Sequence, residues 1–275
     1  MTAATSHRRP VGRDMLVHLV NLDSRPDRLA HMTAALRAAG LPFERIAATD
    51  GRDPEVAARA AALGPSANGR PISSAAYGCF QSQRRAWLRI LDGGRSHGMV
   101  FEDDLHLAGD LSFLADAAWV PADADIVKLE TFGTRAHIAR RAAARIGPRR
   151  LVRLHSTHMG AAAYVISARA AEVLLRRTET VTDPVDELLF NDRLGWFEGA
   201  VTFQMCPAPA VQAGMHGRHL ARGPLASWSA SSIPDRSAGG DVIDREAWGS
   251  RLTRRVREEA RARLARTRYT VVSFG

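Results

Sequence analysis

A short apolar run near the N-terminus constrains the fold more than any other feature. Residues 15–22, with the sequence MLVHLVNL, have the β-branched and aliphatic density of a buried central strand. A helical pattern follows, with Ser24 placed to cap it, Pro26 in its first turn and Gly40 at its end. Residues 43–48 have a second strand pattern. Strand, helix and strand in this order predict a parallel sheet in an α/β fold.

The same alternation continues to about residue 212. We expect strands at residues 98–101, 126–129, 161–166 and 200–205, with an edge strand at 151–154 after an arginine-rich stretch at 135–150. Residues 52–74 predict a helix and a mobile loop, and further helices are expected at 81–91, 168–177 and 183–194. The chain therefore divides into a flexible arm at 1–14, an α/β domain at 15–212, a Gly/Ser/Pro-rich linker or acceptor loop at 213–244, and a basic amphipathic helix and tail at 245–275.

Composition excludes several classes of protein. Apolar residues make up 45% of the 275 residues and charged residues 24%, which excludes a disordered or coiled-coil chain. No apolar run reaches the length of a membrane span, and the N-terminus has no secretory pattern, so a cytoplasmic location is expected. Cys79 and Cys206 lie far apart, and we interpret them as buried free thiols.

The net charge of +9 is almost entirely arginine, because Lys128 is the only lysine. Arginine suits anionic partners such as a sugar nucleotide, a membrane surface or a nucleic acid. No specific nucleic acid is expected, because aromatic residues are not interleaved with the basic runs as a base-stacking platform requires.

Three consecutive acids end one of the predicted strands. Glu102, Asp103 and Asp104 repel one another, and oxygen ligands of this kind hold Mg²⁺ or Mn²⁺ together with substrate phosphates. Ligands of open α/β sheets bind beyond the carboxyl ends of the strands, where these acids lie. A solvated acidic turn or a helix cap is the alternative interpretation.

Several sequence blocks in a fixed order resemble glycosyltransferase family 25, the lipopolysaccharide and lipooligosaccharide sugar transferases. The resemblance covers roughly residues 15–212. It rests on residues 17–28 (VHLVNLDSRPDR), 43–51 (FERIAATDG), 78–82 (GCFQS) leading to Trp87, 100–104 (VFEDD), and 160–167 (GAAAYVIS) with 184–186 (PVD).

This resemblance implies a GT-A-like fold, which is a Rossmann-type mixed sheet flanked by helices, here with an extra C-terminal helical segment. It also implies a UDP-sugar donor and a bound Mn²⁺ or Mg²⁺, with Glu102 and Asp104 as metal ligands and Asp103 on the donor side. The family usually has Ser-His where this chain has Ser82 and Gln83, and this departure bears on donor choice and on activity itself.

Further donor-binding residues are expected at the strand and helix ends. Arg25 and Arg28 begin the first helix, where free N–H groups also favour phosphate. The alternative, a solvated surface charge, is as plausible for Arg25 but weaker for Arg28. Asn21 and Asp50 follow the first two strands, where uracil and ribose would be bound, and Asp50 with Gly51 is alternatively only a turn.

The resemblance implies an inverting reaction, which requires a base on the acceptor side. Asp186 and Glu187 are the candidates, because they open a helix far in sequence from the metal acids. The alternative is that they complement the helix dipole. His155 and His158 could contact acceptor or diphosphate but lack a third partner at metal-ligand spacing.

Together these features predict an enzyme that transfers a hexose, galactose or glucose, from a UDP-sugar to a glycan or glycolipid of the lipopolysaccharide type. The terminal basic helix, with Trp248, Leu252 and Val256 on one face, predicts peripheral contact with the anionic inner membrane face, or else packing on the domain. A catalytically altered partner subunit and an arginine-rich nucleic-acid-associated protein are the alternative functions.

Overall fold

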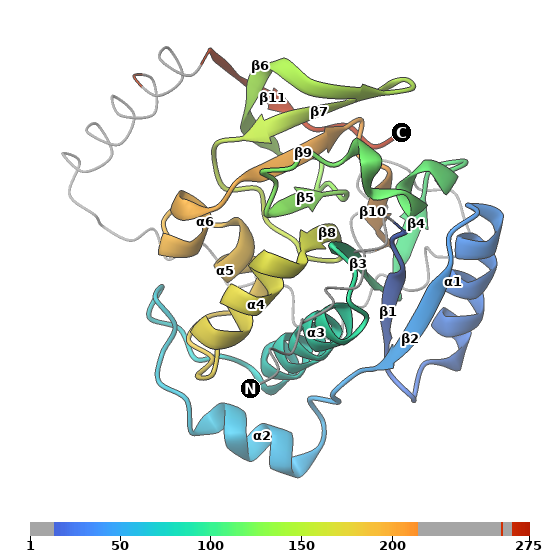
Figure 1. The fold of residues 1–275 in the computed structure, drawn as a ribbon. Coiled ribbons are helices and arrows are strands. Elements are labelled where there is room, and N and C mark those ends of the chain that lie inside the picture. Colours follow the sequence, from blue (N-terminus) through green and yellow to red (C-terminus); the bar gives the residue numbers. More distant parts are fainter. Residues whose placement is uncertain (1–13, 214–259, 261–265) are drawn as a thin grey trace, which may run out of the picture.

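The protein forms a large mixed sheet flanked by helices, which confirms the predicted α/β class. The computed structural model describes residues 14–213, 260 and 266–275 (Figure 1). In these residues nine strands form one sheet, in the order β11-β6-β7-β9-β5-β8-β3-β1-β2, and β10 pairs with β4. The strands are β1 (Val17–Asn21), β2 (Phe43–Ala47), β3 (His97–Glu102), β4 (Leu105–Leu107), β5 (Ile126–Lys128), β6 (Arg135–Ile146), β7 (Arg149–Leu154), β8 (Ala163–Ser167), β9 (Thr202–Cys206), β10 (Ala210–Gln212) and β11 (Thr267–Val271).

Helices cover both faces of the sheet, because side chains of the central strands alternate between two apolar cores. Met99 and Phe101 of β3 pack in the core shared with α1, whereas Val100 packs in the core shared with α3, α4 and α5. The helices are α1 (Pro26–Ala38), α2 (Pro54–Ala61), α3 (Ser74–Asp92), α4 (Ala168–Arg177), α5 (Val185–Phe190) and α6 (Gly195–Gly199). None of the helices in the described residues is long and apolar enough to cross a bilayer.

The strand directions bring several carboxyl ends to one edge of the sheet. Strand β1 is parallel to β2 and β3, and β8 is antiparallel to both β3 and β5. Strands β1, β2, β3 and β5 therefore all end at the same edge. Ligand sites of open α/β sheets form at such an edge.

Two helix starts differ from the prediction. Ser24 does not cap α1, because the N-cap residue is Arg25 and the Ser24 hydroxyl instead accepts a hydrogen bond from Arg52. Helix α3 begins at Ser74, well before residue 81, with the Ser73 hydroxyl as its cap. Within this first part of α3, Gly78 allows the helix to pack closely against the backbone at Thr49. A Cβ at residue 78 would lie only 2.6 Å from the Thr49 carbonyl oxygen.

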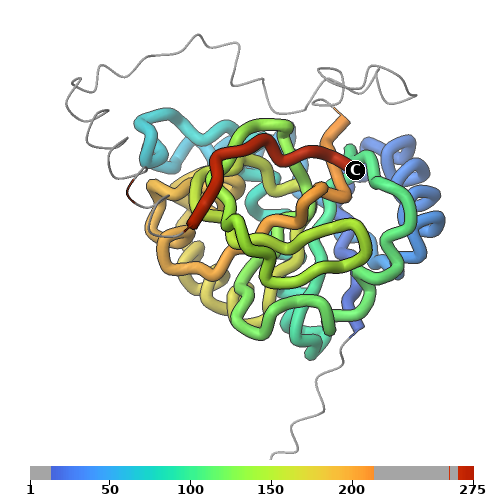
Figure 2. Tube along the Cα trace, turned by 90° about the horizontal axis from the view of Figure 1, so that it is seen from above, coloured from blue at the N-terminus to red at the C-terminus, as the bar shows by residue number. Residues whose placement is uncertain are grey.

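The last described residues belong to the sheet. Residues 267–271 form β11, which pairs antiparallel with β6, so this part of the predicted helix and tail at 245–275 is a strand (Figure 2). The arginine-rich stretch expected to precede an edge strand is itself β6, a strand of 12 residues between β11 and β7. The predicted arm, most of the 213–244 segment and nearly all of the predicted basic helix lie outside the described residues.

Candidate active site

Acidic and amide side chains from separate strands meet at the carboxyl edge of the sheet. Glu102 is the last residue of β3, and its carboxylate accepts hydrogen bonds from Gln83 of α3 at 3.2 Å and from Gln212 of β10 at 3.3 Å. The thiol of Cys79 lies 3.4 Å from the same carboxylate. Burial, Asp104 and Glu130 raise the pKa of Glu102 to about 8. Glu102 as a whole residue is only partly exposed.

Asp103 points into the protein and joins two elements. Its carboxylate accepts 2.7 Å and 3.1 Å hydrogen bonds from Asn21 of β1 and Arg28 of α1. Asn21 is nearly fully buried, and Arg45 of β2 donates to its side-chain oxygen at 3.0 Å. Asn21, Arg28 and Asp103 therefore form one buried network that ties the first strand and helix to the acidic turn.

Asp104 has a different position from its neighbour. Its Oδ2 lies 3.7 Å from the Arg28 guanidinium, and its buried Oδ1 has no hydrogen-bond partner among the described residues. Burial raises its pKa, although Arg28 opposes the shift. A buried carboxylate oxygen without a partner is costly unless a ligand satisfies it.

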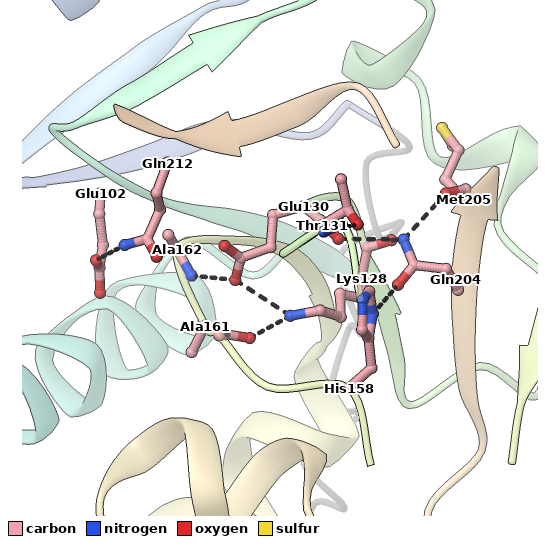
Figure 3. A network of polar contacts seen from close by, with 12 residues as sticks. Glu102, Lys128, Glu130, Thr131, His158, Ala161, Ala162, Gln204, Met205 and Gln212 are labelled. Carbon is pink, nitrogen blue, oxygen red and sulfur yellow. Dashed lines mark hydrogen bonds and ion pairs between the residues drawn. The ribbon is translucent and has the colours of Figure 1, made fainter. Parts of the chain in front are cut away.

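A fully buried ion pair lies beside the acidic turn. Lys128, the last residue of β5, donates to Glu130 at 3.2 Å and also to the carbonyl of Gly160 (Figure 3). Glu130 Oε1 accepts a 2.6 Å hydrogen bond from the Ala162 N–H, whereas Oε2 is buried without a partner in the described part of the chain. Burial lowers the pKa of Lys128 and raises that of Glu130. Glu130 is thus a fourth acid of this site.

Hydrogen bonds connect the Glu102 carboxylate to the core. The Trp87 indole donates to the Tyr164 hydroxyl at 2.7 Å, and that hydroxyl donates to Gln83 Oε1 at 2.6 Å. The opposite end of the Gln83 amide donates to Glu102 and to the Ala161 carbonyl. Gln83 is completely buried, so any effect that it has on donor binding is transmitted through its hydrogen bond to Glu102.

The other expected donor residues have local partners. Ser82 is completely buried, and its hydroxyl bridges the Thr49 N–H and the Gly78 carbonyl. Asp50 pairs with Arg52 at 2.6 Å, and this arginine lowers the pKa of Asp50. Residue 51 is glycine, and a Cβ there would lie 2.6 Å from the backbone of α3. The turn at Asp50 therefore packs closely against α3. Arg25 pairs with Asp27 at 2.7 Å.

The two candidate bases share α5 but differ in their contacts. Asp186 is close enough to Cys79 and Lys128 to act on the pKa of both: its charge adds to the rise that burial causes at Cys79 and opposes the fall that burial causes at Lys128. The Glu187 carboxylate accepts a 2.6 Å hydrogen bond from the side chain of Asn191. Asp186 is therefore the one with an electrostatic link to the group of residues around Glu102.

The two histidines considered from the sequence have different surroundings. His158 is buried, lies 3.0 Å from the Gln204 side chain, and has its pKa lowered to about 3 by burial and Lys128 (Figure 3). The backbone N–H of His155 donates to the His137 carbonyl at 2.8 Å, and burial lowers the pKa of the His155 ring.

The acidic turn offers two carboxylates as possible ligands of a divalent cation. No group of three or more His, Cys, Asp or Glu residues is arranged to hold a metal within the residues that the structure describes. Mg²⁺ and Mn²⁺ sites in phosphate chemistry need only one or two carboxylates, with water and substrate as the other ligands. Oδ1 of Asp104, which has no partner among the described residues, and the carboxylate of Glu102 would supply that number.

Comparison of the sequence with known proteins shows which family the chain belongs to. The model of glycosyltransferase family 25, described as an LPS biosynthesis protein, matches residues 15–189. The chain belongs to glycosyltransferase family 25. It is therefore a glycosyltransferase that uses a nucleotide sugar, as the sequence blocks predicted.

Individual members of family 25 are similar to most of the chain. LgtB of Neisseria gonorrhoeae, a lacto-N-neotetraose biosynthesis glycosyltransferase, is 33% identical over 227 residues, which are 76% of this chain and 79% of the relative. LgtE of Neisseria meningitidis serogroup B is 29% identical over 219 residues, covering 74% and 76%. A solved structure of an active-site mutant of LgtC covers 82% of this chain and 99% of its own at 11% identity, but its TM-score of 0.38 is too low to bear on function.

Sequence reasoning missed Lys128, Glu130 and Tyr164 in this family 25 site. One signal was present, because the only lysine of the chain stands at the end of an apolar strand with Glu130 two residues later. A lysine in such a strand needs a buried anionic partner. Nothing local pointed to Tyr164, whose partners Trp87 and Gln83 lie more than 70 residues away in the sequence.

Proposed function

We propose that this family 25 enzyme transfers a hexose, galactose or glucose, from a UDP-sugar to a glycan or glycolipid acceptor of lipopolysaccharide biosynthesis, with inversion and with Mn²⁺ or Mg²⁺. The observation that carries the proposal is Oδ1 of Asp104, which has no partner among the described residues and lies beside Glu102 at the edge where four strands end. The similarity to two Neisseria glycosyltransferases named for lacto-N-neotetraose biosynthesis supports the acceptor class.

The donor diphosphate would bind at the acidic turn. Glu102 and Asp104 would hold the cation, which supplies positive charge to the departing diphosphate when it is bound. Asp103 keeps Arg28 and Asn21 in place behind that turn, so the donor-side roles expected for these three residues become positioning roles. Ser82 and Gln83 are likewise proposed to position neighbouring residues and not to contact the donor, because both are completely buried.

The acceptor hydroxyl must lose a proton as the new bond forms. Asp186 is the proposed base, because it lies within electrostatic reach of Cys79 and Lys128. Glu187 is already bound by Asn191 and is proposed to orient the helix start. The buried Lys128–Glu130 pair contributes fixed charges close to this region.

A donor panel tests the proposal. The full-length protein is mixed with UDP-galactose, UDP-glucose, UDP-N-acetylglucosamine or CMP-sialic acid, with and without Mn²⁺, and its thermal stabilisation and nucleotide release are measured. Stabilisation by one UDP-hexose only in the presence of the cation is expected, because a bound ligand raises stability according to its affinity. Equal stabilisation in excess EDTA would remove the metal from the proposal.

The alternative of an inactive partner subunit is tested in the same experiment, because it predicts no nucleotide release with any donor. Location in the cytoplasm remains a proposal from the N-terminal sequence, and peripheral contact with the inner membrane face is one that the terminal basic segment suggested. That segment lies almost wholly outside the described residues.

A further inference from the structure

A row of side chains crosses one face of the sheet near its carboxyl edge. In the strand register Val100 of β3 is level with Tyr164 of β8, which is level with Lys128 of β5. The row continues through Gln204 of β9 to Val152 of β7. These five side chains point to the same face of the sheet, because residues directly opposite each other in neighbouring strands share a face.

The next row on this face, two residues nearer the edge, begins at the acidic turn and ends in arginines. It contains Glu102 of β3 and Cys206 of β9, each two positions beyond a member of the first row. Cys206 is level with Arg150 of β7, and Arg150 is level with Arg145 of β6. The acid of the proposed donor site and two arginines therefore lie on one face of the sheet and at the same edge.

The two arginines of this row are like charges opposite each other, which destabilises a sheet. Arg145 is exposed and Arg150 is half-buried, and neither forms an ion pair with a residue that the structure describes. Exposed Arg59 and Arg176, in contrast, each pair with a glutamate four residues away. A bound anion between the guanidinium groups of Arg145 and Arg150 would turn their repulsion into an attraction.

A third arginine adds to this positive charge. Arg268 of β11 is level with Ile138 of β6, whose side chain packs in the same small core as Cys206. The Nε atom of Arg268 is buried without a hydrogen-bond partner among the described residues. Arg150 and Arg268 both lie close enough to Cys206 to oppose the rise in its pKa that burial causes. Arg268 is therefore near Cys206 on the face that carries Arg150.

The distance from the acidic turn limits what a ligand of these arginines can be. Strands β7 and β3 are four positions apart in the sheet, and neighbouring strands lie about 4.8 Å apart, so Arg150 is roughly 20 Å from Glu102 (Figure 1). One sugar ring cannot span that distance, and a diphosphate bound at the acidic turn does not reach the arginines. A glycan of several sugar units can occupy both places.

The helices on this face place the proposed base on the same side of the sheet. Helix α5 packs on the face through Leu189, and the next helix, α6, reaches the core around Cys206 through Phe197. Asp186, the proposed base, belongs to α5. The acceptor end that would react at Asp186 and the three arginines therefore share one face of the sheet.

We propose that Arg145, Arg150 and Arg268 bind a phosphate or carboxylate group of the acceptor, several sugar units away from the hydroxyl that receives the hexose. Arginine binds both groups through paired N–H donors. The inference rests on the proposed function, because it assigns the anion to the acceptor glycan. The enzyme should therefore prefer an anionic oligosaccharide to a neutral one of the same length.

The test is isothermal titration of the full-length, metal-free protein with four probes at low salt. They are maltotetraose, maltotetraose 1-phosphate, the aldonic acid of maltotetraose, which has a carboxylate at its reducing end, and inorganic phosphate. We expect the better of the two anionic sugars to bind roughly tenfold or more tightly than maltotetraose, because it gains charge-assisted hydrogen bonds. Which anionic sugar binds better distinguishes a phosphate site from a carboxylate site. Inorganic phosphate should bind more weakly than that sugar.

Two double variants locate the binding. Arg145→Gln/Arg150→Gln should remove the advantage of the anionic sugars over maltotetraose. Arg37→Gln/Arg70→Gln, which removes the same charge from exposed residues elsewhere, should change that advantage less than about twofold, because distant surface charges are screened. Without ligand, Arg145→Gln/Arg150→Gln should melt at the wild-type temperature or above it, since the repulsion between the two arginines is gone.

Four results would overturn the inference: equal affinity for neutral and anionic sugars, inorganic phosphate binding as tightly as the better anionic sugar, equal losses in the two double variants, or an undiminished anion preference in Arg145→Gln/Arg150→Gln. The titrations need no donor, cation or turnover. A protein that prefers the anionic sugars but releases no nucleotide in the donor panel contradicts only the proposed function. A protein that releases nucleotide but shows no anion preference contradicts only this inference.

Discussion

The hydroxyl of Tyr164 donates a 2.6 Å hydrogen bond to Oε1 of Gln83, and this bond decides which way the buried amide faces. With Oε1 occupied, the amide N–H₂ group is directed at the Glu102 carboxylate. An inverted amide would place two oxygen acceptors against each other. The core of the protein thus orients an acid at the edge of the sheet.

Tyr164→Phe should therefore reduce both stability and turnover. It leaves the buried Trp87 N–H and Gln83 Oε1 without a partner, which costs about 1–3 kcal/mol in a urea unfolding curve. The amide of Gln83 is then free to rotate, and we expect a kcat loss beyond that of Tyr77→Phe, the control on α3. A stability loss with unchanged kcat and KM would limit Tyr164 to a structural role.

Breaking the buried pair at β5 should destabilise the protein strongly. Lys128→Met leaves Glu130 buried without its cation and should lower the free energy of unfolding by about 3–5 kcal/mol. The double variant Lys128→Met/Glu130→Gln should recover part of that loss, because no unpaired charge remains. A double-mutant cycle, measured by chemical denaturation, gives the coupling energy between Lys128 and Glu130. Additive effects of the two substitutions would contradict the prediction.

The neighbouring acids Asp103 and Asp104 should respond differently to neutralisation. Asp104→Asn should abolish cation-dependent turnover with little change in melting temperature, because its Oδ1 has no protein partner in the described residues. Asp103→Asn should lower the melting temperature, since it weakens the buried bonds to Arg28 and Asn21. Asp92→Asn, on an exposed residue at the end of α3, is the control. The reverse pattern would exchange the two roles.

Neutralising each of the two acids of α5 should have different effects, because Asp186 is the proposed base and Glu187 is not. Asp186→Asn should lower kcat by about 10²-fold or more with nearly unchanged UDP affinity, because a base acts on the acceptor. Glu187→Gln should have a smaller effect, since the amide can still bind Asn191. Isothermal titration with UDP and initial-rate kinetics measure the two quantities. Loss of UDP affinity in Asp186→Asn would place that residue on the donor side.

Stability should fall in acid because of a histidine in β1. Burial lowers the pKa of His18 to about 4, so below its unfolded-state pKa of 6.5 the unfolded chain binds a proton that the folded protein does not. The contribution is complete above pH 6.5 and is lost as the pH falls toward 4, by about 3 kcal/mol. His18→Gln should flatten this part of the pH dependence of the free energy of unfolding, and an unchanged slope would exclude His18 as its source.

The sequence by itself determined the elements whose patterns are local. The apolar runs around residues 17–21, 99–101 and 163–166 match buried strands, and Gly40 ends α1 with a positive φ of 70°. The sequence also singled out the acidic turn after β3 as a candidate site, because three adjacent carboxylates are unfavourable without a ligand. Pattern and order of blocks were sufficient to indicate family 25, which the family model matches.

Only the tertiary structure decided which contacts the neighbouring acids make. Asp103 and Asp104 are adjacent in the sequence, yet Asp103 is bound by Asn21 and Arg28 whereas Asp104 has an oxygen without a partner in the described residues, because successive side chains of the turn point in different directions. Lys128 meets Glu130 and the loop at Gly160 only once β5 and β8 pair. Strand β11 joins β6 across more than 120 residues, and such long-range pairing leaves no local pattern because its energy comes from contacts that exist only after folding.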